Sequence, residues 1–331
     1  MSTTPVDVAV ERVRRVYGRW RRDTPISDMR ADWDRLFPAP APDVVLRADS
    51  AAGVEVLWVI APPAPPARAP VPPREPVTAR APVPPRDSAR PRVLLYFHGG
   101  GYKLGSVTSH RDLMARIGAA AHCQVLGVNY RLAPEAHFPA AVDDALTVYE
   151  WLIAAGLPPA QIAVAGDSAG GGRAAALLLC LRDRGCAVPA AAVLLSAWTD
   201  LTAQGESYTT RAEADPIHQR AMILATARQY LGPDGDAANP LASPLFGSLA
   251  GLPPLLLQVG DRETGLDDSI RFAAKARAAG VRADLEVYDD MIHVFQQFAA
   301  EIPQARLAIA AIGRFLLGIW GEPTVEGLRP C

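Results

Sequence analysis

Apolar residues along this chain follow two alternating patterns: short continuous runs, and longer stretches in which they recur every three or four positions. The continuous runs predict strands at 54–60, 93–97, 124–130, 162–166, 191–197, 254–259 and 283–289. The periodic stretches predict helices at 6–20, 109–121, 139–155, 168–184, 267–279 and 303–317. Buried strands that alternate with helices form a mostly parallel sheet with both faces covered, so we predict an α/β fold.

Residues 200–250 interrupt this alternation. They are polar, with helices expected near 206–213 and 217–231, and proline punctuates the remainder. The pattern alone leaves two interpretations open. The segment is either a cap that lies over the sheet, together with the amphipathic N-terminal helix, or an ordinary long connection.

A second interruption, residues 61–92, is rich in proline, alanine and arginine and repeats "ARAPVPPR" at 67–74 and 79–86. Proline removes backbone donors and favours the extended polyproline conformation, which suits a core segment poorly. We expect a mobile surface insertion, and the alternative is a docking peptide for an aromatic groove. Deletion of residues 67–86 should leave activity and melting temperature nearly unchanged.

Composition narrows the classes of function. The 331 residues are 50% hydrophobic and carry a net charge of −2, so a large core can form and no basic excess favours nucleic acid or an anionic membrane. No apolar run is long enough to span a bilayer, and the first residues do not resemble a secretory signal. The four cysteines lack metal-ligand spacing, and reduced thiols in a cytoplasmic protein are expected at Cys123, Cys180, Cys186 and Cys331.

The stretch "AVAGDSAGGG" (163–172) predicts a nucleophile on a sharp turn between a strand and a helix. Ser168 lies between Gly166 and Gly170 in the pattern G-x-S-x-G, where small neighbours permit a tight turn that projects the serine. The helix that follows directs its free N–H groups at the same place, that of Ala169 first, and such groups suit an oxyanion. The alternative is a serine in an ordinary glycine turn.

The stretch "YFHGGGYKLGS" (96–106) follows another predicted strand. Gly99, Gly100 and Gly101 leave backbone N–H groups free to approach a ligand closely, as an oxyanion formed at Ser168 requires. A phosphate-binding P-loop would end in glycine followed directly by its lysine and its hydroxyl residue, and this stretch lacks that sequence. We interpret His98 as an orienting residue that bonds to backbone.

With these motifs, the chain resembles bacterial members of the hormone-sensitive-lipase family of α/β-hydrolases. The resemblance covers nearly all of the chain except the proline-rich segment and rests on "HGGGYKLGS" (98–106), "NYRLAPEAHFPAAVDD" (129–144), "GDSAGGG" (166–172), "SAWTDLT" (196–202), "PLASPL" (240–245), "LPPLLLQVGDRE" (252–263) and "MIHVF" (291–295). It implies an α/β-hydrolase fold with a helical cap, ester hydrolysis without cofactor or metal, and a small-molecule ester as substrate. It also implies that two of Gly99, Gly100 and Gly101, the latter two, join Ala169 in the oxyanion hole. A homodimer is common among such relatives.

The resemblance also implies a division of the chain. N-terminal cap helices would occupy residues 1–50, and a cap segment residues 200–250. The catalytic core would comprise residues 51–199, with the proline-rich insertion, and residues 251–331. Arg173 stands where the family usually has an apolar residue, and we expect it either to extend toward solvent or to pair with an acid.

The serine needs a base, and in α/β-hydrolases the order along the chain is serine, acid, histidine. His293 and His218 are the only histidines after Ser168. His293 follows the last predicted strand directly, in a loop, and we predict that it is the base.

The acid must follow a strand that ends near the site, and "VGDRETGLDD" (259–268) offers four candidates. Glu263 stands where the family places its acid, and we predict that it orients His293. Asp267 and Asp268 begin a predicted helix, where they would cap free N–H groups, and Asp267 also matches a second, usually structural, family acid. Asp261 is so close to the strand that we assign it to the turn.

The motifs predict a serine hydrolase that works through an acyl-enzyme, and the resemblance implies that it is a carboxylesterase acting on esters of short or medium acyl chains. The main alternative is an N-acetyl deacetylase or a lactone hydrolase that acts on a secondary metabolite. Alternatives of another class are an acyltransferase, a ligand-binding member without hydrolysis, and a scaffold that binds partners through the proline-rich repeat.

Overall fold

The computed structural model describes residues 3–63 and 91–321, so the proline-rich repeat at 67–86 lies outside the described residues. Eight strands form one sheet in the order β1-β2-β4-β3-β5-β6-β7-β8. Their bounds are β1 Val45–Ala51, β2 Val54–Ile60, β3 Val93–Phe97, β4 Gln124–Asn129, β5 Ile162–Asp167, β6 Ala191–Leu195, β7 Leu255–Gly260 and β8 Ala283–Tyr288. The pairs β1–β2 and β2–β4 are antiparallel and the others are parallel, which confirms the predicted mostly parallel sheet.

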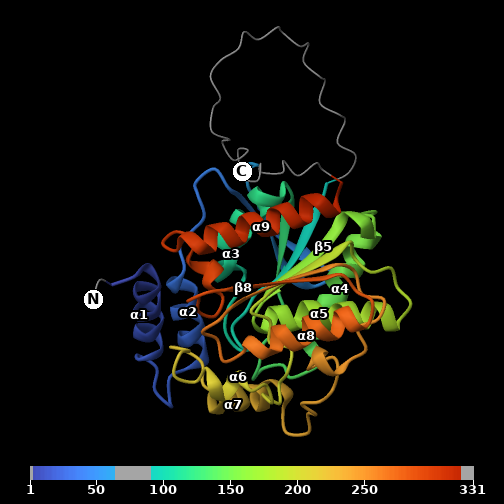
Figure 1. Cartoon of the computed structure of the whole chain (residues 1–331). Coiled ribbons are helices and arrows are strands. Elements are labelled where there is room, and N and C mark those ends of the chain that lie inside the picture. The colour runs from blue at the N-terminus through green and yellow to red at the C-terminus, as the bar shows by residue number, and fades with distance from the viewer. Residues whose placement is uncertain (1–2, 64–90, 322–331) are drawn as a thin grey trace, which may run out of the picture.

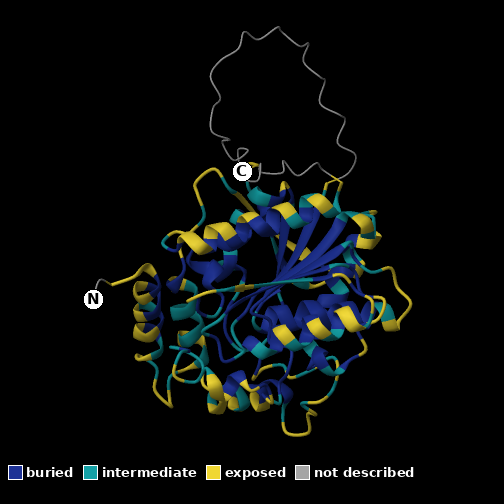
Figure 2. Cartoon of the chain, viewed as in Figure 1, coloured by how far each residue is buried: buried dark blue, intermediate teal, exposed yellow. Residues whose placement is uncertain are grey.

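Helices cover both faces of the sheet (Figure 1). On one face lie α3 (Val107–Ala121) and α9 (Pro303–Ile319); on the other lie α4 (Ala140–Ala154), α5 (Ala169–Asp183) and α8 (Leu266–Ala278). The strands β3, β5, β6 and β7 are buried along their whole length, and the helices turn their exposed residues away from them (Figure 2). Burial on both faces explains why these strands are continuous apolar runs in the sequence.

The remaining helices lie outside these two layers. They are α1 (Pro5–Tyr17), α2 (Ile26–Leu36), α6 (Ser207–Thr210) and α7 (Arg220–Leu231). Helix α1 begins with a capping box, in which the Thr4 hydroxyl accepts the N–H of Asp7 and the Asp7 carboxylate accepts the N–H of Thr4. Its buried face joins the core cluster that contains α3 and α9.

The apolar pattern of the sequence predicted neither α2 nor β1. Helix α2 fully buries only Leu36, so its sequence carries little apolar periodicity. Strand β1 is an edge strand whose residues are exposed up to Ala51, so it carries no apolar run either. Because residues 45–50 belong to the sheet, the N-terminal helical segment ends before Val45. Helix α6 spans only four residues, shorter than predicted.

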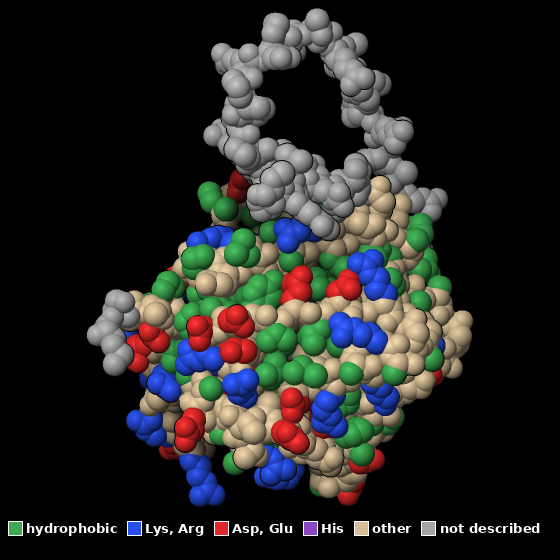
Figure 3. Space-filling model, viewed as in Figure 1, with side chains coloured by type: hydrophobic (Ala, Val, Ile, Leu, Met, Phe, Trp, Pro, Cys, Tyr) green, Lys and Arg blue, Asp and Glu red, His purple; other side chains and the backbone are tan. Residues whose placement is uncertain are grey.

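The surface in Figure 3 mixes basic and acidic side chains over the face that it draws, as the small net charge suggests. Among the helices of the described ranges, none combines the length and the apolar character needed to cross a membrane.

Candidate active site

Ser168 lies at the turn between β5 and α5, at the carboxyl end of a buried parallel strand. Its backbone adopts φ +52° and ψ −120°, a conformation that non-glycine residues rarely take, and it is the N-cap of α5. The Ser168 N–H donates to Leu195 O at 2.8 Å, and the Trp198 N–H donates to Ser168 O at 2.9 Å. The neighbouring strand β6 and its following loop therefore hold the strained turn in place.

Both glycines of the motif are required by close backbone approaches. A Cβ atom on Gly166 would lie 2.3 Å from the carbonyl oxygen of Gly170. A Cβ atom on Gly170 would lie 2.0 Å from the carbonyl oxygen of Phe97, at the end of the adjacent strand β3. Contacts this short do not occur, so the spacing of the motif reflects the packing of the turn against the sheet.

His293 and Glu263 are in direct contact. Nδ1 of His293 lies 2.7 Å from Oε2 of Glu263, although 30 residues separate them in the chain. The other carboxylate oxygen, Oε1, accepts the N–H of Gly260 at 2.6 Å and the hydroxyl of Ser196 at 2.7 Å. With three polar partners the buried carboxylate is well satisfied, and its orientation toward the imidazole is fixed.

The pKa of His293 reflects this pairing. Burial alone lowers the pKa, but the charge of Glu263 and its hydrogen bond outweigh burial, so the net pKa lies above the ordinary value of a histidine. His218 differs, since burial lowers its pKa to about 4 and leaves it neutral near pH 7. The two rings meet edge to face, with centroids 4.4 Å apart.

Ser196 is a site residue that sequence reasoning missed. It follows β6, adopts φ +45°, donates to Glu263, and accepts the N–H of Val294 at 3.1 Å. It thus joins the loop of the acid to the loop of the histidine. The signal that could have identified Ser196 is its position: it is a polar residue directly after the buried strand β6. Strand β6 pairs with β7, the strand that leads to Glu263.

The glycine loop after β3 lies beside Ser168. The Gly99 N–H is already bonded, to Oδ1 of Asp167 at 3.1 Å and to Nε2 of His110 at 3.3 Å. Gly100 and Gly101 both have positive φ and line the same cavity as Ser168, and no hydrogen bond of their N–H groups is present within the described residues. The resemblance implied that two of the three glycines, Gly100 and Gly101, donate to the oxyanion, and in the structure it is the N–H of the third, Gly99, that is already bonded.

His98 holds this loop, as expected. Its Nδ1 lies 2.8 Å from Gly99 O, and its ring stacks on Tyr130, whose hydroxyl donates to His98 O at 2.6 Å. Burial lowers the pKa of His98 to about 3, so it is a neutral donor to backbone. Tyr96 adds a further bond under the loop, from its hydroxyl to Asp167 at 2.8 Å.

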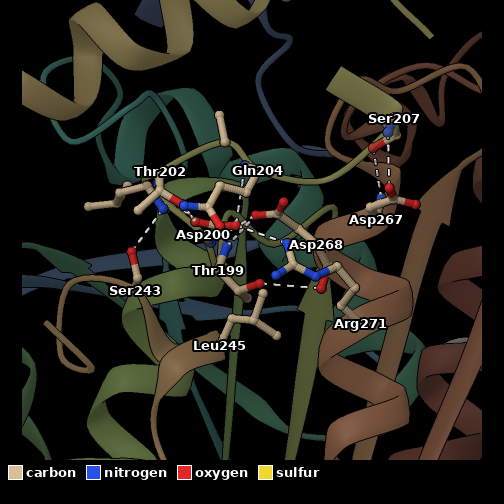
Figure 4. A network of polar contacts seen from close by, with 12 residues as sticks. Thr199, Asp200, Thr202, Gln204, Ser207, Ser243, Leu245, Asp267, Asp268 and Arg271 are labelled. Carbon is tan, nitrogen blue, oxygen red and sulfur yellow. Dashed lines mark hydrogen bonds and ion pairs between the residues drawn. The ribbon is translucent and has the colours of Figure 1, made fainter. Parts of the chain in front are cut away.

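The other acids of the 259–268 stretch serve the architecture. Oδ2 of Asp268 accepts the N–H groups of Thr199 and Asp200, each at 2.9 Å, and Oδ2 of Asp267 accepts the N–H of Ser207 at 2.9 Å (Figure 4). We expected these carboxylates to cap their own helix, which is wrong: α8 has no side-chain cap, and both bind the segment after β6 instead. The Asp261 N–H donates to Tyr288 O at 3.0 Å, in the turn after β7.

Arg173 neither reaches solvent nor pairs with an acid, contrary to both expectations. It is fully buried in α5, 5.1 Å above the ring of Tyr102 and 5.5 Å from that of Tyr230, whose hydroxyl it contacts. Its Nε and Nη1 atoms have no hydrogen-bond partner among the described residues. Aromatic faces therefore replace the carboxylate that was expected.

A cavity of about 280 Å³ opens over Ser168 and His293. Its walls come from the glycine loop, from α1 and α2, from the loop before α7 and α7 itself, and from the residues after His293. Most of its lining is apolar, including Tyr17, Trp20, Phe37, Met222, Ile223 and Phe298. A larger open groove of about 700 Å³ adjoins it at Met29 and Lys103 but contains none of Ser168, Glu263 and His293.

No group of histidine, cysteine, aspartate and glutamate that could hold a metal ion is present in the part of the chain that the structure describes.

Several known proteins with similar sequences and structures are hydrolases. A family model described as the alpha/beta hydrolase fold matches residues 94–297. An acetyl-hydrolase of Streptomyces hygroscopicus is 45% identical over 231 residues, 70% of this chain and 77% of the relative. An ethyl acetate hydrolase of Pseudomonas putida is 34% identical over 218 residues, 64% of this chain and 68% of the relative. A crystal structure of an esterase from the bacterial hormone-sensitive lipase family has a TM-score of 0.85 and 41% identity, covering 97% of this chain and 100% of that chain.

Proposed function

This chain belongs to the bacterial hormone-sensitive-lipase family of α/β-hydrolases, and on this premise we propose which of its residues hydrolyse a carboxylic ester. The protein is a carboxylesterase. We assign the nucleophile to Ser168, the base to His293 and the orienting acid to Glu263. The observation that carries the assignment is the 2.7 Å contact between His293 and Glu263 beside a cavity that Ser168 and His293 both line.

Acylation follows from this assignment. The Ser168 hydroxyl attacks the ester carbonyl carbon while Nε2 of His293 takes its proton. Glu263 accepts a hydrogen bond from the N–H at Nδ1 of His293, which leaves Nε2 free to act as the base, and its negative charge stabilises the imidazolium that forms. His293 then gives the proton to the leaving alcohol. In deacylation, water repeats the sequence on the acyl-enzyme.

The oxyanion of each tetrahedral intermediate needs donors that are not already used. We assign this role to the N–H groups of Gly100, Gly101 and Ala169. Ala169 is the first residue of α5, so its N–H has no partner inside the helix. Gly99 is left out of the hole because its N–H donates to Asp167, and its role is to fix the loop.

Residues 1–44 and 200–250 act as the cap. Support comes from the lining of the cavity, to which α1, α2, α7 and the loop between α1 and α2 contribute Val13, Tyr17, Trp20, Trp33, Met222 and Ile223. A second cavity of only about 20 Å³, lined by both Ser168 and His293, has room for roughly one water-sized group. The small cavity supports a short acyl group, and the names of the two relatives, an acetyl-hydrolase and an ethyl acetate hydrolase, agree with it.

A substrate panel tests the proposal. The native chain and Ser168→Ala are compared on a 4-nitrophenyl ester series of increasing acyl length, an acetamide and a lactone. We expect hydrolysis of short-chain esters by the native chain and its loss in Ser168→Ala. Hydrolysis that persists in Ser168→Ala would refute the mechanism, and a preference for the acetamide or the lactone would favour the alternative substrates.

Two further proposals concern the cellular location and the oligomeric state of the enzyme. A cytoplasmic location is supported by the free thiols of Cys123, Cys180 and Cys186, because the cytoplasm keeps thiols reduced. Cell fractionation tests it.

A homodimer is supported by the exposed apolar side chains of Val45 and Leu46 on the edge strand β1. Sedimentation analysis over a range of concentrations tests it, and a constant monomer mass would refute it.

A further inference from the structure

The open groove that adjoins the catalytic cavity is lined by cations. Its volume is about 700 Å³, and the described residues along it include Arg21, Arg22, Lys103 and Arg228 but no aspartate or glutamate. The whole chain carries a net charge of −2, so composition does not explain this local excess of positive charge. A concave surface lined by one sign of charge attracts ligands of the opposite sign.

The four cations are not neutralised by neighbouring acids. None of them forms an ion pair with a carboxylate of the described residues. Asp23 and Asp234 are next to lining residues in the chain, but both are exposed and neither lines the groove. Glu135 is already paired with Arg30, at 2.7 Å. The positive charge of the groove is therefore available to a ligand.

Lys103 connects the groove to the catalytic cavity, since it lines both. Its Nζ atom donates to Oε1 of Gln229 at 3.2 Å, and Gln229 lines only the groove, so the ammonium lies on the groove side. An ammonium group has three donors, and this bond uses one of them. Partial burial lowers the pKa of Lys103, a cost to the charged form that a bound anion would offset.

Hydrogen bonds between distant segments hold the groove in shape. Nε of Arg30 donates to Lys103 O at 2.9 Å, and Nη2 of Arg30 donates to Ala133 O at 3.0 Å. These bonds join α2 to the glycine loop and to the loop after β4. The Phe138 N–H donates to Tyr230 O at 2.9 Å, which joins that second loop to the end of α7. The cations are thus placed before any ligand binds.

The position of Lys103 sets where on a substrate the anion would be. Lys103 is two residues after Gly101, and two residues span at most about 7 Å, so the anion would lie a short linker away from the ester carbonyl. The acid that lines the intervening cavity, Asp167, is already bonded to Tyr96 at 2.8 Å and lies 3.2 Å from His110. Because the small cavity beside Ser168 suits a short acyl group, the anion belongs to the alcohol part.

We propose that the groove binds an anionic group on the alcohol part of the ester substrate, held by Lys103 and Arg228. This inference rests on the proposed function, because it concerns the substrate of the same site. The two side chains determine specificity and take no part in proton transfer. Arg21 and Arg22, which are exposed, add attraction that salt screens.

Two matched pairs of acetate esters test the proposal. The first pair is 4-acetoxybutanoate and 5-acetoxypentan-2-one, and the second, with a longer linker, is 6-acetoxyhexanoate and 7-acetoxyheptan-2-one. Within each pair a methyl ketone replaces the carboxylate, so the shape is kept and the charge is removed. The readout is the ratio of kcat/KM for the anionic ester to that for its ketone, because effects of a variant on the catalytic machinery cancel in this ratio.

We expect Lys103→Met to lower this ratio by about tenfold in at least one pair, because its ammonium is partly buried. Arg228→Gln should lower the ratio in the same pair by about two- to fivefold, because Arg228 is exposed. Arg184→Gln is the matched control: Arg184 is an exposed arginine at the end of α5, outside both cavities, so the ratio should not change. Added salt should lower the ratio of the native chain.

Hydrolysis of 4-nitrophenyl acetate, measured alongside, separates failure of this inference from failure of the proposed function. If the native chain hydrolyses that ester, a ratio within about twofold of native in both pairs for both Lys103→Met and Arg228→Gln would overturn the inference alone. The absence of turnover of both anionic esters by that active chain would overturn it as well. If the native chain hydrolyses none of the five esters, the proposed function is refuted, and this inference with it.

Discussion

Replacing Glu263 by glutamine makes the sharpest test of the triad, because the structure dictates how the new amide must sit. Oε1 of Glu263 accepts the backbone N–H of Gly260 at 2.6 Å. A backbone N–H cannot accept a hydrogen bond, so the amide oxygen must take this place. The amide nitrogen then occupies the position of Oε2, 2.7 Å from Nδ1 of His293. There it donates to Nδ1 and forces the histidine proton onto Nε2.

This arrangement removes the base. An imidazole with its proton on Nε2 cannot take the proton of Ser168, and the imidazolium loses its anionic partner. In serine hydrolases the same carboxylate-to-amide change costs about 10⁴ in kcat. We therefore expect kcat to fall by about 10³–10⁴, which is about 4–5 kcal/mol of transition-state stabilisation. KM should change little, because Glu263 is only 1% exposed and does not line the cavity.

Steady-state hydrolysis of 4-nitrophenyl acetate by native and variant chains is the assay. The melting temperature of Glu263→Gln should stay close to native, since the contacts of Oε1 are kept. Asp267→Asn is the matched control: its oxygen can still accept the Ser207 N–H, so near-native turnover is expected. Turnover of Glu263→Gln within tenfold of native would refute the reasoning, and loss of activity in Asp267→Asn instead would reverse the assignment.

Three other outcomes follow from the charged groups. Because Glu263 holds the pKa of His293 above the ordinary 6.5, the acid limb of kcat/KM for a neutral ester should lie above pH 6.5; a limb below it would contradict the pairing. The Arg173 guanidinium is buried with two donor atoms that lack a partner among the described residues, so we expect Arg173→Met to keep or raise the melting temperature. A fall of more than about 4 °C would show instead that the aromatic contacts of Arg173 dominate. Burial raises the pKa of Asp268 from 3.8 to about 7, so the folded state binds the Asp268 proton more tightly than the unfolded state does. The free energy of unfolding that this proton contributes is lost as pH rises from about 4 through 7. Asp268→Asn should therefore cost less free energy of unfolding at pH 8 than at pH 5 in urea titrations, and an equal or larger cost at pH 8 would refute the shift.

Much of the fold was predictable from local pattern. The strands that both helical layers cover are continuous apolar runs, because every side chain on them is buried, and β3, β5, β6 and β7 were all predicted. Strand β1 and helix α2 were missed because each buries little of its own surface. Their stability comes from neighbours, β2 for the strand and the helices α1 and α3 for the helix, and a sequence pattern does not record neighbours.

At the site, the sequence alone determined the candidate residues that local signals mark. Ser168 between two glycines and the glycine loop after β3 are marked by the backbone conformation that their turns require. His293 is marked by its place in the chain, after the last strand. Only the tertiary structure brought Oε2 of Glu263 to His293, used the N–H of Gly99 for Asp167, and placed Asp267 and Asp268 against the segment after β6. These contacts join residues that are 30 or more positions apart, and the direction of a carboxylate or an N–H group depends on what the packed chain presents to it.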